Sequence, residues 1–167
     1  FNRLAAAGDE EVVVLLESGC TVTEGWLEAL LRALERPEYG LAGPSTNIGW
    51  NEQRAIADAT SAELASQAAR ERFGEQTRTL EPLYSLADFC YAVRRDVIAA
   101  IGEADEQYGL GPCWEMDYNV RAARAGYRGV WVCGAYVHRP PIPARRRVAE
   151  AQWFAASRQR YQDKFCG

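Results

Sequence analysis

Two acidic residues at the start of a predicted helix could do acid–base chemistry. Glu115 follows Trp114, and a carboxyl beside an indole in a partly dry loop can have a raised pKa and act as a general base. Asp117 lies two residues further on, with Arg121 four residues after it. The helix dipole also favours acidic residues at a helix start, and Asp117 with Arg121 is an ordinary i,i+4 ion pair. A structural role for these residues therefore stays open.

Glu17 and His138 each come at the end of a predicted strand. Glu17 and Ser18 directly follow an apolar run, and a carboxylate there can ligate a hard cation such as Mg²⁺ or bind a sugar hydroxyl. His138 is the single histidine and leaves a later strand. A polar turn and a structural histidine are the alternatives, because a carboxylate after a buried strand is also the first group to reach water. We expect Glu115 and His138 to line a common cavity.

Three consecutive arginines, Arg145, Arg146 and Arg147, follow a proline-rich loop. Guanidinium groups can hold phosphate oxygens through paired hydrogen bonds, although a solvated basic turn is the alternative. Together these residues predict a carboxylate-plus-histidine pocket under an arginine lid, suited to transfer chemistry on a diphosphate-bearing substrate. The chain has no Walker A loop, no glycine-rich dinucleotide fingerprint and no H-E-x-x-H motif, so those enzyme classes lack support.

The elements that must position these groups alternate between strand and helix. The apolar run 11–16 predicts a central parallel strand buried on both faces, and Thr23 is predicted to cap a helix that carries an apolar stripe from Trp26 to Leu34 and ends near Pro37. Such alternation indicates an α/β fold with a largely parallel sheet, whose ligands bind beyond the carboxyl ends of the strands. Further strands are predicted at 39–43, 86–93 and 129–137, and further helices at 57–73, 96–101, 115–125 and 148–165.

Composition limits the classes of protein to be considered. The 167 residues are 48% apolar and 25% charged, which is typical of one globular domain with a sizeable core. The net charge of -4 gives no global positive field, so no nucleic-acid partner is expected. No apolar run approaches the roughly 20 residues of a transmembrane helix. The five cysteines form no C-x-x-C pair and are odd in number, so we expect a reducing compartment rather than a disulfide framework.

Several short segments occur in the order seen in family 2 glycosyltransferases, and the chain resembles that family along nearly its whole length. The segments are 12–27 (VVVLLESGCTVTEGWL), 43–47 (GPSTN), 89–95 (FCYAVRR), 102–106 (GEADE), 115–117 (EMD) with Arg121, 125–128 (AGYR) and 137–138 (VH). The resemblance implies the Rossmann-like GT-A fold, a three-layer α/β sandwich with a mostly parallel mixed sheet, as a single domain over 1–167. It also implies inverting transfer of a sugar from a nucleotide-diphosphate donor to an acceptor hydroxyl, as in glycan biosynthesis.

The resemblance carries functional roles over to residues of this chain. Glu115 matches the catalytic base, with Asp117 beside it. Glu17 and His138 match ligands of Mn²⁺ or Mg²⁺, weakened because Gly19 stands where the family has a second aspartate. The residues expected to bind the donor are Glu17, Ser18, Arg121, Arg145, Arg146 and Arg147, and those expected to bind the acceptor are Trp114 and Asn47.

The family normally begins with a βαβ segment that grips the nucleobase, and no counterpart precedes Phe1 in this sequence. This chain is therefore expected to be the later part of a larger fold. A non-catalytic sugar-binding or scaffolding relative is the second hypothesis. The expected partners are a nucleotide-sugar donor and a glycan, lipid or protein acceptor. The expected location is cytoplasmic, either free or peripheral at the inner face of the membrane.

Overall fold

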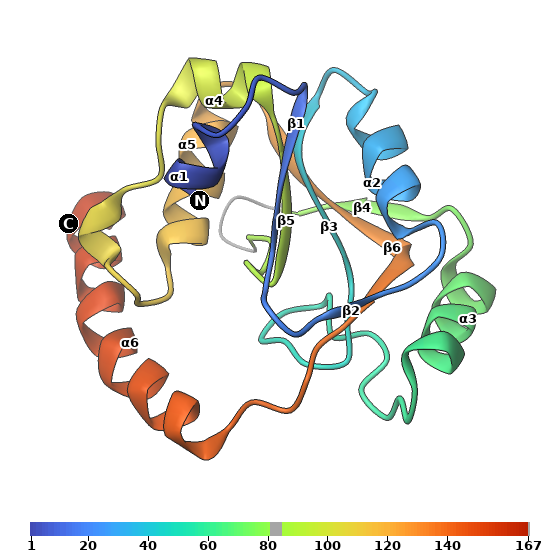
Figure 1. Ribbon diagram of the computed structural model, residues 1–167. Coiled ribbons are helices and arrows are strands. Elements are labelled where there is room, and N and C mark those ends of the chain that lie inside the picture. The colour runs from blue at the N-terminus through green and yellow to red at the C-terminus, as the bar shows by residue number, and fades with distance from the viewer. Residues whose placement is uncertain (81–84, 167) are drawn as a thin grey trace.

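The computed structural model describes residues 1–80 and 85–166 and has a mixed α/β fold (Figure 1). Its helices and strands, in chain order, are α1 (Asn2–Ala5), β1 (Val12–Leu16), β2 (Thr21–Val22), α2 (Trp26–Leu34), β3 (Tyr39–Ser45), α3 (Ala62–Phe73), β4 (Thr77–Thr79), β5 (Cys90–Arg94), α4 (Arg95–Ile101), the 3₁₀ helix η1 (Glu106–Tyr108), α5 (Trp114–Arg124), β6 (Arg128–His138) and α6 (Ala144–Phe165).

The strands form one mixed sheet in the order β1-β5-β3-β6-β2, with β4 also paired to β6. Within the described ranges β3 and β6 are the only parallel neighbours, and the other four pairings are antiparallel. The prediction of an α/β fold with a mixed sheet is confirmed, but the prediction of a mostly parallel sheet is wrong. The reason is that β5 inserts, antiparallel, between β1 and β3, so the strands of the first strand–helix–strand unit run in the same direction without being neighbours.

β1 lies at one end of this strand order and not at its centre. Most of its residues are half-buried, so the expectation of a central strand buried on both faces is wrong. Val12 and Val14 pack against the core under α2, whereas Leu15 packs against the core on the opposite face. An apolar, β-branched run is therefore compatible with a strand that has partial cover on both faces.

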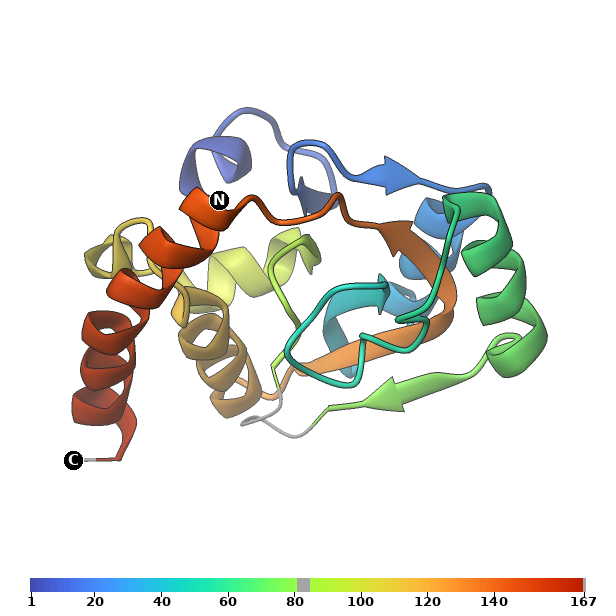
Figure 2. The same cartoon turned by 90° about the horizontal axis from the view of Figure 1, so that it is seen from below.

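Two hydrophobic cores lie on opposite faces of the sheet. On β5, Cys90 and Ala92 face the core beneath α2, and Tyr91 and Val93 face the core beneath α4 and α5. This alternation is the period of two that a strand imposes on its side chains. α6 packs outside α5 through a smaller cluster that includes Tyr161, so it forms the outer layer on that side (Figure 2).

β6 bends near its middle, and the bend directs its carboxyl end across the sheet. Its pairing with β3 moves from Pro44 opposite Val132 to Ser45 opposite Tyr136, which is a bulge in β6. Ser45 Oγ donates a hydrogen bond to the Cys133 carbonyl oxygen (2.6 Å) and holds this bulge. Since a bulge bends its strand, the end of β6 turns toward β2 and carries the following residues over the edge of the sheet.

Two helices begin four or five residues away from their predicted starts. α3 begins at Ala62, five residues after the predicted start, because the Ser61 hydroxyl accepts a hydrogen bond from the Leu64 N–H and caps it there. α6 begins at Ala144, directly after Pro143 and four residues before the predicted start, so the three arginines lie in its first turn. None of the helices in the described residues has the length and apolar character that crossing a membrane requires.

Candidate functional site

The chain segments that adjoin four strands meet at one edge of the sheet. β1, β3 and β6 run in the same direction, so their carboxyl ends lie together, and the amino end of the antiparallel β5 joins them. The pairing of Leu16 with Cys90 fixes the end of β1 beside the start of β5. This is the edge at which α/β sheets place their ligands.

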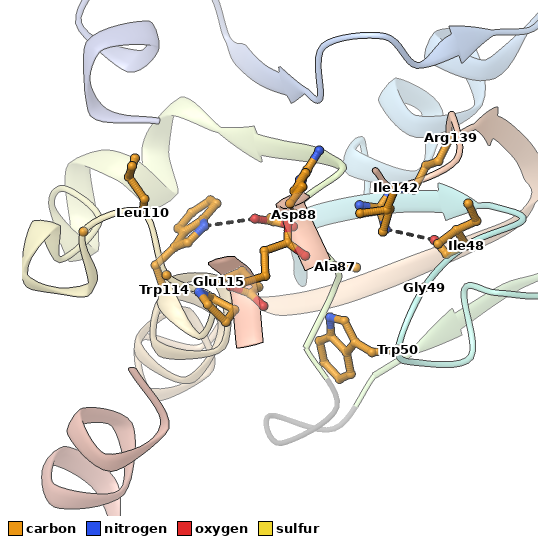
Figure 3. A pocket seen from close by; sticks show the side chains of 15 residues that line it. Ile48, Gly49, Trp50, Ala87, Asp88, Leu110, Trp114, Glu115, Arg139 and Ile142 are labelled. Carbon is orange, nitrogen blue, oxygen red and sulfur yellow. Dashed lines mark hydrogen bonds and ion pairs between the residues drawn. The ribbon is translucent and has the colours of Figure 1, made fainter. Parts of the chain in front are cut away.

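A cavity of about 500 Å³ opens at this edge (Figure 3). Its walls come from 48–50 after β3, 87–88 before β5, the loop 109–112, the start of α5 at 114–115 and the segment 139–150 that leads into α6. A cavity of this size suits a ligand of sugar or nucleotide dimensions.

Glu115 and Asp88 place two carboxyl groups in the wall of this cavity (Figure 3). Glu115 is 3% exposed, and its Oε2 has no hydrogen-bond partner among residues 1–80 and 85–166. Burial, with a further contribution from the Asp88 charge, raises the pKa of Glu115 to about 8. Burial also raises the pKa of Asp88, although the Trp114 indole N–H donates to Asp88 Oδ2 (3.2 Å) and lowers it in part. The cavity therefore holds a carboxyl group that can exchange a proton near neutral pH.

A strained turn presents Glu115 and Trp114 to the cavity. Cys113, just before α5, has φ of 80°, a left-handed conformation that is uncommon outside glycine and that clusters at functional sites. The Trp114 ring then lies between Phe1 (centroids 5.7 Å apart) and Tyr91 (5.4 Å), which fixes its orientation. The first turn of α5 thus delivers an indole and a carboxyl to the same cavity wall.

Glu17 holds two arginines at the cavity. Arg139 Nε donates to Glu17 Oε2 (2.8 Å), and Arg146, from the first turn of α6, pairs with Glu17 Oε1. Burial alone would raise the pKa of Glu17, but the hydrogen bonds and charges of the two guanidinium groups outweigh burial and lower it. Arg146 also pairs with Glu150, four residues on. Both arginines line the cavity.

Asn47 holds the backbone of Arg139. Asn47 Oδ1 accepts a hydrogen bond from the Arg139 N–H (2.8 Å), and Asn47 Nδ2 donates to the Arg139 carbonyl oxygen (3.0 Å). The Arg139 side chain also donates from Nη1 to the Ile48 carbonyl oxygen (3.0 Å). Asn47, predicted to bind the acceptor, is therefore the clamp that joins the loop after β3 to the segment after β6.

The residues around Glu17 do not offer a metal donor set in this arrangement. Both Glu17 oxygens face guanidinium groups, and no cluster of three or more His, Cys, Asp or Glu side chains suited to a metal occurs in the described ranges. Gly19 has φ of 88°, and a Cβ there would lie 3.3 Å from Pro140, so an aspartate at this position would be strained and crowded. The Mn²⁺ or Mg²⁺ site stays a prediction.

His138 does not line the cavity, so the structure does not bring it together with Glu115. Its Nδ1 lies 2.9 Å from the Tyr136 hydroxyl, and it pairs with Thr21 in the β2–β6 ladder. Successive side chains of a strand point to opposite faces, so the residue after it, Arg139, occupies the cavity wall instead.

Asp117 and Arg121 lie outside the cavity wall and join α5 to its neighbours. The Asp117 carboxylate is fully buried and pairs with Arg121 Nε (2.6 Å) and Lys164 Nζ (2.5 Å). Arg121 also donates from Nη1 to the Ile101 carbonyl oxygen (2.8 Å). This arrangement favours the structural alternative for both residues.

The remaining predicted site residues are divided between the cavity and the surface. Trp114 lines the cavity. A second indole, that of Trp50, also lines it, with 54% of its surface exposed. Ser18 is exposed and lies outside the cavity wall, as do Arg145 and Arg147.

Two residues of the site, Asp88 and Arg139, were not among the predicted candidates. Asp88 is the single charged residue in the otherwise apolar run 86–93, and a lone carboxylate in such a run indicates a buried polar site. Arg139 directly follows a strand whose end reaches the ligand edge, and that position marks it as clearly as it marks His138.

No protein-family model matches this chain, and no curated protein matches it. The resemblance to family 2 glycosyltransferases therefore stays a prediction.

Proposed function

We propose that this chain transfers a sugar from a nucleotide-diphosphate donor to an acceptor hydroxyl, with inversion at the anomeric carbon. The observation that carries the proposal is the buried Glu115 carboxyl in the wall of a sugar-sized cavity, whose Oε2 has no hydrogen-bond partner in the described part of the chain. Its pKa of about 8 makes it a stronger base than an ordinary glutamate, and a base is most effective when its pKa lies near the working pH.

The reaction is a single displacement. The acceptor oxygen forms a bond to the anomeric carbon while the bond from that carbon to the diphosphate oxygen breaks, and the hydroxyl proton passes to Glu115 Oε2. Negative charge develops on the departing diphosphate. Arg139 and Arg146 are the cationic side chains in the cavity wall, and guanidinium groups stabilise such charge through paired hydrogen bonds.

Two indoles supply surfaces on which sugar rings can lie. Trp114 is fixed beside Glu115 by its hydrogen bond to Asp88, and Trp50 lies exposed at the cavity. Aromatic rings pack against the apolar faces of sugars while the hydroxyl groups remain free to form hydrogen bonds. We assign donor or acceptor stacking to these two rings.

A second candidate function is sugar binding without catalysis. The observation that favours it is that both arginines in the cavity wall are already paired with Glu17. In this arrangement the cavity suits a neutral sugar better than a diphosphate. In that case Trp50 and Trp114 bind the sugar, and Glu115 acts only as a hydrogen-bonding group.

Isothermal titration with UDP, GDP and dTDP, each with Mn²⁺, with Mg²⁺ and with EDTA, tests the proposal. Binding of at least one nucleotide is expected, and the EDTA arm tests the predicted cation. No heat with any nucleotide, together with binding of free sugars or oligosaccharides, would establish the second candidate.

Replacement of Glu115 by Gln tests the catalytic role directly. Glu115→Gln keeps the shape of the side chain but cannot take a proton, so turnover is expected to fall about 10²- to 10⁴-fold with donor affinity nearly unchanged. Glu63→Gln, on the exposed surface of α3, is the matched control. A Glu115→Gln variant with the wild-type rate would remove Glu115 as the base.

A further inference from the structure

We propose that Arg139 and Arg146 form a diphosphate site that the Glu17 carboxylate occupies while the ligand is absent. The site holds an internal anion: Glu17 Oε2 accepts from Arg139 Nε (2.8 Å) and Oε1 pairs with Arg146. A bound diphosphate takes the place of this carboxylate on the two guanidinium groups. The inference deepens the proposed function, since the ligand is the leaving group of the proposed donor.

The Arg139 guanidinium has contacts that do not depend on Glu17. Its Nη1 donates to the Ile48 carbonyl oxygen (3.0 Å), its charged group lies 5.4 Å from the centre of the Phe89 ring, and the residue is only 8% exposed. Because these contacts stay when the carboxylate leaves, Arg139 keeps its place in the cavity wall. The site is therefore built before the ligand arrives.

Arg146 and Glu17 are the parts that exchange partners. Arg146 is 44% exposed, and it keeps Glu150 as a second partner when it releases Glu17. The Glu17 backbone N–H donates to the Phe89 carbonyl oxygen (2.7 Å), so the backbone of this residue stays in place while its side chain turns away. The exchange needs movement of one glutamate side chain and one surface arginine.

A diphosphate is a better partner than Glu17 for two guanidinium groups. It carries more negative charge than a carboxylate and presents more oxygen acceptors, so it can accept paired hydrogen bonds from both arginines at once. Glu17 competes for the same donors and repels the incoming anion. Removing the Glu17 charge should therefore strengthen diphosphate binding.

Removing the Glu17 carboxylate has opposite expected effects on diphosphate affinity if Glu17 is an internal anion and if it is a metal ligand. A carboxylate that held a divalent cation would support diphosphate binding, so its removal would weaken binding in the presence of that cation. The two roles are separated by a single variant measured with and without Mn²⁺.

The test measures inorganic pyrophosphate binding by isothermal titration at constant ionic strength. In EDTA, Glu17→Gln is expected to bind pyrophosphate about tenfold or more tightly than the wild type, which is about 1.4 kcal/mol. Glu63→Gln, on the exposed surface of α3 and outside the cavity wall, is the control, and a change of less than about threefold is expected. Adding Arg139→Gln to Glu17→Gln should abolish the gain.

Equal or weaker pyrophosphate binding by Glu17→Gln in EDTA overturns the inference. Pyrophosphate binding by this variant that is weaker than that of the wild type only when Mn²⁺ is present also overturns it. Thermal melts establish that each variant is folded. For the wild type alone, the arginine Nε–H signals in NMR spectra give a second readout: pyrophosphate should shift the Arg139 signal, and an unchanged signal at saturation also overturns the inference. Pyrophosphate contains no nucleoside, so this result is independent of whether UDP, GDP or dTDP binds.

Discussion

The carboxyl groups of Glu115 and Asp88 lie together in the cavity wall, where the Trp114 indole N–H is bonded to Asp88. Two neighbouring carboxyls with little access to water cannot both ionise without a large cost, so the pair retains a proton at pH values where free carboxyls have lost theirs.

Folding stability should fall as pH rises because of Glu115. Its pKa is raised from 4.5 to about 8, so the folded chain keeps a proton that the unfolded chain releases. This contribution is complete below about pH 4.5 and is lost as pH rises through 8. The expected result is a negative slope of unfolding free energy against pH between pH 5 and 8, measured by urea denaturation. Glu115→Gln should flatten this slope, and an unchanged slope would contradict the raised pKa.

Asp88→Asn should lower the pKa of Glu115, because it removes the negative charge beside that carboxyl. The expected result is an acidic limb of the pH–rate profile that moves to lower pH, together with a matching shift in an NMR titration of the Glu115 carboxyl carbon. Asp58→Asn, at an exposed position, is the control. A Glu115 titration that stays in place would show that burial alone sets its pKa.

Asp117→Asn should damage stability and leave ligand binding intact. The Asp117 carboxylate is fully buried between Arg121 and Lys164, and removing one member of a buried ion pair costs about 3 to 5 kcal/mol. Lys164 reaches solvent, so the lower end of that range is expected in urea denaturation. Because Asp117 lies outside the cavity wall, nucleotide affinity of the folded variant should match that of the wild type. Lost binding with full stability would place Asp117 in the site.

Gly19→Asp should destabilise the chain without creating a cation site. The φ of 88° suits glycine, and a side chain at this position would meet Pro140. The expected cost is about 1 to 2 kcal/mol in thermal or urea unfolding. Mn²⁺ affinity, measured by titration, should stay at the wild-type level, since Glu17 remains paired with arginines. Mn²⁺ binding gained by the variant would show that this position can ligate a metal.

Asn47→Ala should loosen the Arg139 side of the cavity. The variant removes both hydrogen bonds that Asn47 makes to the Arg139 backbone, with an expected loss of about 1 to 3 kcal/mol in unfolding free energy. Pyrophosphate affinity should fall in parallel, because Arg139 is no longer held in the cavity wall. Asn47→Asp keeps one acceptor for the Arg139 N–H, so its unfolding free energy should lie between those of Asn47→Ala and the wild type. Full stability in Asn47→Ala would show that these two hydrogen bonds do not hold the Arg139 backbone in place.

Most of the elements follow from local patterns that the sequence contains in full. The stripe of apolar residues in 26–34 predicts α2, and Gly102 and Gly126 follow the ends of α4 and α5 with the positive φ that favours glycine. The strands β2 and β4 escaped prediction because they are two and three residues long and largely polar, so their only signal is the partner they find on β6.

Strand direction and neighbours are decided in three dimensions. The alternation of strands and helices predicts a parallel sheet, but it does not predict the direction or the neighbours of β5. This strand fits between β1 and β3 because its two faces complement the cores on either side. The same insertion brings Asp88 beside Glu115, although 27 positions separate them in the sequence.

The sequence by itself determined the α/β class, most of the helices and the longer strands, and the Trp114–Glu115 pair at the start of a helix. Those features depend on periodicity and local capping, which act over a few residues. Only the tertiary structure decided that Arg139 rather than His138 lines the cavity and that Arg146 reaches Glu17. It also decided that Asp117 pairs with Lys164 outside the cavity wall. Strand register and the β6 bulge set which side of a chain faces a cavity, and a shift of one residue reverses that side.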